Sequence, residues 1–276
     1  MITRSCALVA LLFAFAMTAS QAENLKEIEI TDQFPIDRCV MNPGLGTSCI
    51  GADCNAYLPL IPGRVWTLDN TGCDDCEELE EVQVSILEDP LGLRSIDVGG
   101  EMVWVRVLEE LESEDGEVTE ISWNLVNMCP NTQDVFYWGE DVCIPEDDED
   151  AMEEPAFEGH AACPEGFLYA PDAWRAGIDD AEPGVLMQGG SFLLNAAYFQ
   201  EQAEEADALD WALNAELGLS WGDFEDCVLV LDRNLAEDPK SKEDGDEKVY
   251  CPEIGLVQDE DLMLTSCSDA SGDCAQ

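Results

Sequence analysis

The stretch that decides the fold is EMVWVRVLEELESEDGEVTEISWNLVN, residues 101–127. Apolar residues occupy every second position on either side of the Glu-Asp-Gly triplet at 114–116: Val103, Val105 and Val107 before it, and Ile121, Trp123 and Leu125 after it. A period of two is typical of β-strands, and Asp-Gly between two such runs favours a tight turn. The segment therefore predicts a β-hairpin.

The same alternation occurs on both sides of this hairpin, in residues 82–86, 209–219, 226–233 and 248–257. The segment 209–219, LDWALNAELGL, has the Ala and Leu content of a helix. Its apolar residues nevertheless fall on alternate positions from Leu209 to Leu219, which predicts a long strand. We expect a mainly β protein: a curved antiparallel sheet or an open, barrel-like sandwich with few short helices, stapled by disulfides.

The first 22 residues have the features of a secretory signal peptide. Arg4 is the only early charge, an apolar run extends from Ala7 to Met17, and Ser20-Gln21-Ala22 fits the small-residue rule for cleavage. The run is shorter than the roughly 20 apolar residues that a transmembrane helix needs. We therefore expect a secreted or periplasmic protein with no transmembrane segment.

Composition divides the rest of the chain into three parts. Residues 23–56 form a cysteine-bearing irregular leader, 57–258 a β-rich domain with an acidic loop at 144–166, and 259–276 a C-terminal tail with two cysteines. All but Cys6 of the 13 cysteines follow the signal peptide. An even number of cysteines in an exported chain indicates disulfides. Cys73-Asp74-Asp75-Cys76 favours a disulfide over half of a zinc site, because no second such pair is present.

The chain is strongly acidic, with 62 Asp and Glu against 11 Lys and Arg and a net charge of −51. This balance excludes nucleic acid as a partner, because phosphates are neutralised by Lys and Arg. Three explanations stay open. The acidity is a solvated surface suited to a salty medium, it binds divalent cations, or it attracts a basic partner.

The residues for nucleophilic catalysis are largely missing from the sequence. His160 is the only histidine, it lies in the acidic loop, and no G-x-S-x-G turn is present. We expect His160 to be a surface residue. Carboxylate pairs are too numerous for one to be selected as a glycosidase pair.

Calcium is the one cofactor that the sequence suggests. No EF-hand loop pattern fits, so a site would have to be assembled from other loops. The candidate ligands lie in two acidic runs: Asp147, Asp148, Asp150, Asp179 and Asp180.

Aromatic residues supply a second kind of candidate site. On alternating strands they usually pack in the core, but a concave sheet that leaves some of them uncovered would form a ligand groove. The candidates for such a groove are Trp66, Trp104, Trp123, Tyr137, Trp138 and Trp174.

Five segments, in order, resemble a family of uncharacterised secreted bacterial proteins and lipoproteins. They are YLPLIPGRVW at 57–66, FYWGEDV at 136–142, WRAGIDDAEPGVLM at 174–187, GDFEDCV at 222–228 and EIGLV at 253–257. The resemblance implies a β-rich fold and an envelope location, with no activity or catalytic residues to carry over. In this context YLPLIPGRVW is expected to be the first strand of the domain. Cys129 and Cys143 flank FYWGEDV at a spacing that favours a disulfide closing that loop.

Our leading hypothesis is therefore an exported, non-catalytic protein that binds a small molecule or a protein partner at the cell surface. The alternatives are a calcium-stabilised structural protein of the cell surface and, third, a hydrolase that uses carboxylates alone.

Overall fold

The computed structural model describes residues 30–31, 54–73, 76, 78–189, 192–206, 208–234, 245–270 and 272–274. The strands of the first half are β1 Ile30–Thr31, β2 Val65–Asp69, β3 Glu80–Ile86, β4 Leu93–Val98, β5 Glu101–Glu114, β6 Glu117–Met128, β7 Val135–Pro145, β8 Phe167–Tyr169 and β9 Trp174–Arg175. Those of the second half are β10 Glu182–Met187, β11 Ala197–Phe199, β12 Glu201–Gln202, β13 Asp210–Trp221, β14 Phe224–Asn234, β15 Asp246–Cys251, β16 Gly255–Asp259, β17 Leu262–Asp269 and β18 Gly272–Asp273, with one short 3-10 helix, η4 Glu204–Ala206.

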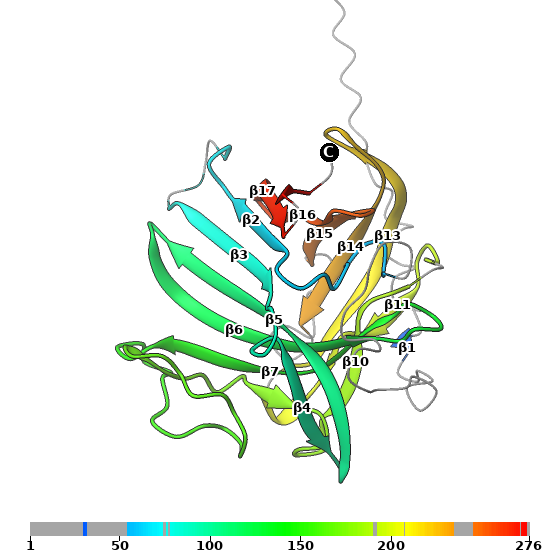
Figure 1. The fold of residues 1–276 in the computed structure, drawn as a ribbon. Helices are drawn as coiled ribbons and strands as arrows, with labels where there is room; N and C mark the ends of the chain where they lie inside the picture. The colour runs from blue at the N-terminus through cyan, green and yellow to red at the C-terminus, as the bar shows by residue number, and fades with distance from the viewer. Residues whose placement is uncertain are drawn as a thin grey trace, which may run out of the picture.

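The strands form one sheet that is nearly closed into a barrel (Figure 1) and is antiparallel except where β1 pairs in parallel with β11. Around one side, β2, β3, β5, β6, β7 and β10 pair in that order. Around the other side the order is β13, β14, β15, β16, β17 and back to β2. The gap between β10 and β13 is bridged by residues 197–202, because β12 pairs with β10 and β11 pairs with β13. The expected mainly β, barrel-like fold is confirmed.

The hairpin predicted from residues 101–127 is β5 and β6. Asp115 and Gly116 form its turn, both in the left-handed region with φ of 49° and 85°, as a type I′ turn requires. Glu112 pairs with Glu120 and Glu110 with Ser122, so carboxylates face each other across the ladder. The long strand predicted over 209–219 is also confirmed as β13, since pairing along its whole length with β14 outweighs its helical composition.

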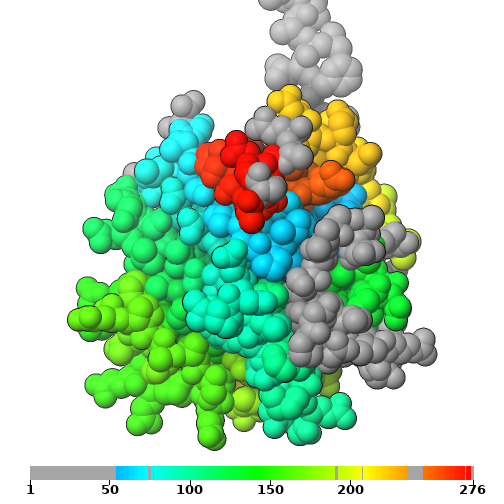
Figure 2. Space-filling view, viewed as in Figure 1, coloured from blue at the N-terminus to red at the C-terminus, as the bar shows by residue number. Residues whose placement is uncertain are grey.

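The sheet continues beyond the boundary expected at residue 258. β17 pairs with β2 from Met263 to Ser268 and so closes the barrel, and in Figure 2 the red C-terminal residues lie against the cyan residues of β2. At the other end, YLPLIPGRVW is a strand only from Val65 onward. The signal peptide and all but residues 30–31 and 54–56 of the leader lie outside the described residues.

Four disulfides join described cysteines: Cys73–Cys76, Cys143–Cys163, Cys227–Cys251 and Cys267–Cys274. Cys54 and Cys129 are also disulfide-bonded. The first of these pairs confirms the prediction for Cys73 and Cys76. Within the described residues, no helix has the length and apolar character needed to cross a membrane.

The expected pairing of Cys129 with Cys143 is wrong. Cys129 directly follows β6 and lies beside the start of β7, because its amide donates to the Asp134 carbonyl, and Cys143 lies near the far end of β7. An extended chain rises about 3.3 Å per residue, which separates Val135 from Cys143 by about 26 Å. A disulfide requires Cα atoms about 4–7 Å apart, and Cys163 meets this requirement at 5.7 Å from Cys143.

Candidate functional site

Two cavities of the barrel share part of their walls. The first, which we call the inner chamber, has a volume of about 240 Å³ and is lined from strands all round the barrel, including β2, β5, β7, β13 and β15. The second, the outer chamber, has a volume of about 490 Å³ and lies at the ends of β3, β5, β15 and β17. Glu110, Glu112, Lys248 and Asp259 line both chambers, and we call these four residues the neck.

Carboxyl groups dominate the wall of the inner chamber. They are Glu110, Glu112, Glu120, Glu140, Glu201, Asp210, Asp232 and Asp259. Lys248 is the one basic residue among the lining residues that the structure describes. Its Nζ lies 3.5 Å from Asp232 Oδ2 and 3.7 Å from Asp259 Oδ2. The wall of the inner chamber therefore has one ammonium group and eight carboxyl groups.

The hairpin and a bulge bring these carboxyls inward. On β5, Glu110 and Glu112 are two residues apart and share a face. On β7, Tyr137 and Glu140 both line the chamber although they are three residues apart, because the register with β6 shifts between Asn124 and Val126. Such a bulge inserts an extra residue and restores inward orientation.

Gly139 makes this bulge possible. Its φ is 131°, and a Cβ on it would lie 2.4 Å from the Trp174 carbonyl oxygen. A side chain at residue 139 would therefore push β9 away from β7, with which it pairs at this point.

Tyr137 and Glu140 form a polar network at the inner end. The Tyr137 hydroxyl oxygen lies 2.8 Å from Glu140 Oε2 and is also hydrogen-bonded to Asn124 Oδ1. One hydroxyl carries a single proton, so both contacts are satisfied when Tyr137 donates to Asn124 and a protonated Glu140 donates to Tyr137.

Burial favours the neutral form of these acids. Desolvation, followed by repulsion from Glu112, raises the pKa of Glu110 to about 7, and the same two effects raise the pKa of Glu120 to about 9. Desolvation also raises the pKa values of Glu112, Glu140 and Glu201. In contrast, attraction to Asp259 raises the pKa of Lys248 and keeps it charged. At neutral pH the inner chamber therefore holds protons that a cation could replace.

Two acceptor atoms in the inner chamber are unpaired within the described part of the chain. Gln200 is only 4% exposed; its amide nitrogen donates to the Leu186 carbonyl, while its Oε1 has no hydrogen-bond partner. Asp232 Oδ1 is likewise without a hydrogen-bond partner. Buried acceptors of this kind are destabilising unless a donor reaches them.

The carboxyls of the chambers do not converge on one point. Among the described residues, the one group of three ligand atoms within 4.8 Å of one another belongs to Cys73, Cys76 and Asp261, and those cysteines form a disulfide. The inner chamber is therefore a distributed acidic surface and not a cage for a single ion.

The six aromatic candidates separate into two groups. Trp66 and Tyr137 line the inner chamber. The other four do not: Trp104, Trp123, Trp138 and Trp174. Trp123 donates to Glu109 and packs under Arg94, and Trp138 donates to Asn127. The structure thus brings only two of these residues together at the cavity, because neighbouring residues on a strand point to opposite faces.

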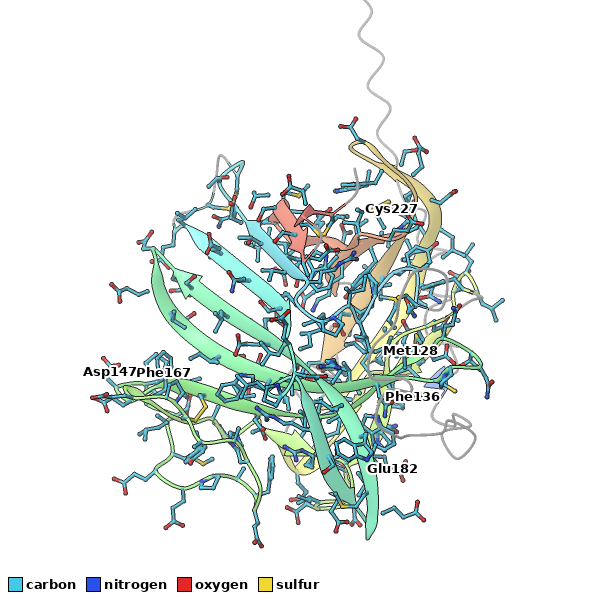
Figure 3. The ribbon with its side chains drawn as sticks, viewed as in Figure 1. Met128, Phe136, Asp147, Phe167, Glu182 and Cys227 are labelled. Carbon is cyan, nitrogen blue, oxygen red and sulfur yellow. A yellow bond between two sulfur atoms is a disulfide. The ribbon has the colours of Figure 1, made fainter. Side chains whose placement is uncertain are left out.

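The five calcium candidates lie away from both chambers. Asp147, Asp148 and Asp150 are exposed in the connection between β7 and β8, and Figure 3 shows Asp147 beside Phe167, where this connection begins and ends. Asp179 and Asp180 are exposed in the turn before β10. None of the five belongs to the group of convergent ligand atoms found within the described residues.

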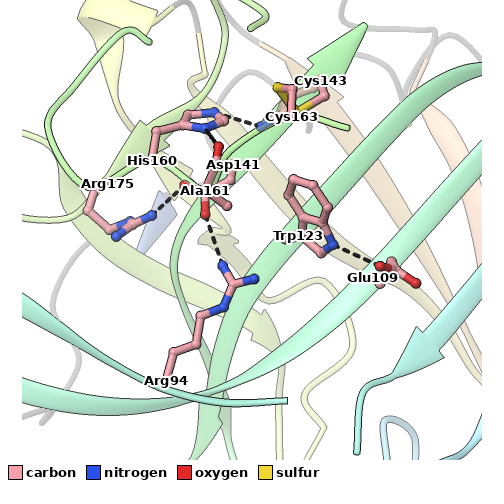
Figure 4. A network of polar contacts seen from close by, with 10 residues as sticks. Arg94, Glu109, Trp123, Asp141, Cys143, His160, Ala161, Cys163 and Arg175 are labelled. Atoms are coloured by element: carbon pink, nitrogen blue, oxygen red, sulfur yellow. Dashed lines mark hydrogen bonds and ion pairs between the residues drawn. A yellow bond between two sulfur atoms is a disulfide. The ribbon is translucent and has the colours of Figure 1, made fainter. Parts of the chain in front are cut away.

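On the outside of β7, a separate network fastens the acidic loop to the barrel (Figure 4). Asp141 is 1% exposed and accepts hydrogen bonds from Arg94 at 3.1 Å and Arg175 at 2.5 Å. His160, expected at the surface, is half-buried and accepts from the Val142 amide at 3.2 Å. These residues position the loop beside the Cys143–Cys163 disulfide.

No family model, curated protein or solved structure matches this chain. The resemblance to the secreted bacterial family stays a prediction.

The acidic inner chamber was not predicted from the sequence, because its eight carboxyl residues lie on seven different strands. One signal was present: beyond Leu108, β5 carries Glu109, Glu110 and Glu112, so charge occurs on both faces of a strand. A strand with one face in an apolar core would not show that pattern.

Proposed function

We propose that this protein is an exported, non-catalytic binding protein whose barrel interior takes an organic cation. The observation that carries the proposal is the inner chamber itself, a cavity lined by eight half-buried carboxyl residues and one lysine. Ionised carboxylates that are buried without partners are destabilising, so they either take up protons or attract positive charge. A cation that enters the chamber supplies the missing partners.

The distribution of ligand atoms favours an organic cation over a metal ion. Calcium takes six to eight oxygen atoms at about 2.3–2.6 Å from one centre, and among the described residues the chamber carboxyls form no convergent group. The wall also contains apolar side chains, among them Leu58, Trp66, Leu108 and Leu256. Such side chains can bury the CH₂ groups of an organic cation, which a metal ion lacks.

The pKa shifts favour binding over hydrolysis by carboxylates. A glycosidase needs one carboxylic acid and one carboxylate, whose surroundings move their pKa values apart. In the inner chamber the pKa values of Glu110, Glu112, Glu120, Glu140 and Glu201 all move upward. Because the pKa values of all five acids move upward, the chamber is suited to take up protons or cations.

Export is supported by the cysteines. Four disulfides between described residues are compatible with an oxidising compartment outside the cytoplasm. The signal-peptide pattern of residues 1–22 points to the same compartment.

The proposal is tested by tryptophan fluorescence, because Trp66 lines the inner chamber. We expect butylamine to give saturable quenching at pH 7.5 and constant ionic strength, and butyrate, which has the opposite charge, to give none. Glu140→Gln should weaken butylamine binding, while Glu117→Gln, an exposed acid at the start of β6, should not. Equal binding of amine and acid, or no effect of Glu140→Gln, would overturn the proposal.

A further inference from the structure

We propose that the ligand of this barrel is a linear aliphatic polyamine whose ammonium groups occupy the inner and the outer chamber together. This inference rests on the proposed function, and it specifies the class of organic cation. Three observations support it: the residues shared by the two chambers, the carboxyl groups in both of them, and an unpaired acceptor in the inner chamber.

We infer one path through the two chambers from the residues that they share. They share Glu110, Glu112, Lys248 and Asp259, so a molecule that fills the inner chamber can extend through this neck into the outer one. The outer chamber is about twice as large as the inner one, at about 490 Å³ against about 240 Å³. A compact cation would occupy only a fraction of that path, whereas a long flexible chain would follow it.

Carboxyl groups occur along the whole path. The inner end holds Glu120, Glu140 and Glu201, and the neck holds Glu110, Glu112 and Asp259. The outer end adds six more: Glu80, Glu81, Glu114, Asp246, Glu260 and Asp261. Each ammonium group along a polyamine would therefore lie near a carboxylate, whether at the inner end, at the neck or at the outer end.

A neighbouring acid raises the pKa of one carboxyl group at each end of the path. A hydrogen bond with Asp246, followed by desolvation, raises the pKa of Glu260 to about 7 at the outer end. Desolvation, followed by repulsion from Glu140, raises the pKa of Glu201 at the inner end. Lys248 neutralises only part of the neck, where it is held between Asp232 and Asp259.

An independent observation points to a donor group at the inner end. Gln200 is 4% exposed, lines the inner chamber, and its Oε1 has no hydrogen-bond partner within the described residues. An ammonium group brings three N–H donors, which can serve Gln200 and a neighbouring carboxylate at the same time. Gln200 Oε1 is a neutral acceptor, so this observation is independent of the charge of the acidic cluster.

The walls also match the methylene segments of a polyamine. Between the carboxyls of the inner chamber lie Leu108, Leu186 and Leu256. An aliphatic chain buries its CH₂ groups against such side chains while its ends stay with the charged groups. Hydrated metal ions offer no apolar surface to these residues.

The test is isothermal titration of the oxidised mature protein with butylamine, putrescine, spermidine and spermine at one ionic strength. We expect the affinity to rise about fivefold for each added ammonium group, which corresponds to about 1 kcal/mol for each partly buried ion pair. Fully N-acetylated spermidine, which lacks the charges, should not bind. The rise in affinity should stop once the amine is long enough to fill both chambers.

Two variants assign the effect to the two ends of the path. Asp246→Asn with Glu260→Gln should remove the gain of spermidine over putrescine and leave butylamine binding unchanged. Glu201→Gln should weaken all four amines. Butylamine binding without any gain along the series would overturn the polyamine inference and leave the proposed function intact, whereas failure of all four amines to bind would overturn both. A gain that survives the outer double variant would show general attraction to the acidic surface, and it would also overturn the inference.

Discussion

The Glu140 carboxyl and the Tyr137 hydroxyl lie 2.8 Å apart on the same strand and point into the same chamber. Residues three apart on a regular strand would lie on opposite faces. The bulge at Gly139 brings them together, so a single backbone irregularity decides whether the Glu140 carboxyl faces the inner chamber.

Replacement of Gly139 by alanine should destabilise the barrel at the bulge. The new Cβ would meet the Trp174 carbonyl at 2.4 Å and would impose a φ of 131° on a residue with a side chain. We expect a loss of about 1–3 kcal/mol in the free energy of unfolding, measured by urea titration. Gly72→Ala is the control, because nothing lies within 4 Å of its Cβ. Equal midpoints for the two variants would show that the bulge tolerates a side chain.

The stability of the ligand-free protein should fall as the pH rises from 5 to 9. Burial raises the pKa of Glu110 to about 7 and that of Glu120 to about 9, from a usual 4.5. Between the usual and the raised pKa the folded state binds more protons than the unfolded state, so rising pH favours unfolding. Melting temperatures at constant ionic strength measure this trend.

A variant distinguishes the effect of the chamber acids on this pH dependence from the effect of general repulsion on the acidic surface. Glu120→Gln removes the ionisation and should raise stability at pH 9 by about 1–2 kcal/mol relative to the wild type. Glu117→Gln, exposed on the same strand, should change it much less. A wild-type melting temperature that is flat or rising over this pH range would contradict the assignment of buried acids.

The loop before β8 should depend on the disulfide that the structure assigns. Peptide mapping of the oxidised protein should recover Cys143 linked to Cys163 and not to Cys129. Cys143→Ser with Cys163→Ser opens a 20-residue loop and should cost about 3 kcal/mol. Opening Cys73–Cys76, which spans three residues, should cost much less. A peptide linking Cys129 to Cys143 would refute the assigned connectivity.

Asp141 should be essential for the folded loop although it faces away from the chambers. Its side chain is 1% exposed and is hydrogen-bonded to Arg94 and Arg175, the latter 8% exposed. Asp141→Asn leaves a buried guanidinium without its counter-charge, which should cost about 3–5 kcal/mol. The exposed Asp97 provides the matched control as Asp97→Asn. Thermal unfolding of the two variants gives the comparison, and similar midpoints would rule out a structural role for the pair of arginines.

The fold followed from the sequence where the signal was local. The period of two predicted both the 101–127 hairpin and β13, for which composition alone favoured a helix. The tail beyond residue 258 was misjudged because the pairing of β17 with β2 joins segments about 200 residues apart, and no local pattern reports such a contact.

The site was less accessible to sequence reasoning. Trp66 and Tyr137 were identified as ligand-binding candidates and do line the chamber. The carboxyls beside them were hidden among 62 acidic residues, because composition cannot separate an inward Glu110 from an outward Glu109. A bulge such as that at Gly139 also reverses the inward and outward positions beyond it.

The most direct test of the acidic chamber is the number of protons released when an organic cation binds. Titration calorimetry with putrescine at pH 7 in phosphate and in HEPES, two anionic buffers with different ionisation enthalpies, gives this number from the difference in observed heat. Alkylammonium groups are fully protonated at this pH, so released protons must come from the protein. We predict a net release, which is reduced in Glu140→Gln with Glu201→Gln. Binding with identical heats in both buffers would contradict an interior whose carboxyls exchange protons for a cation.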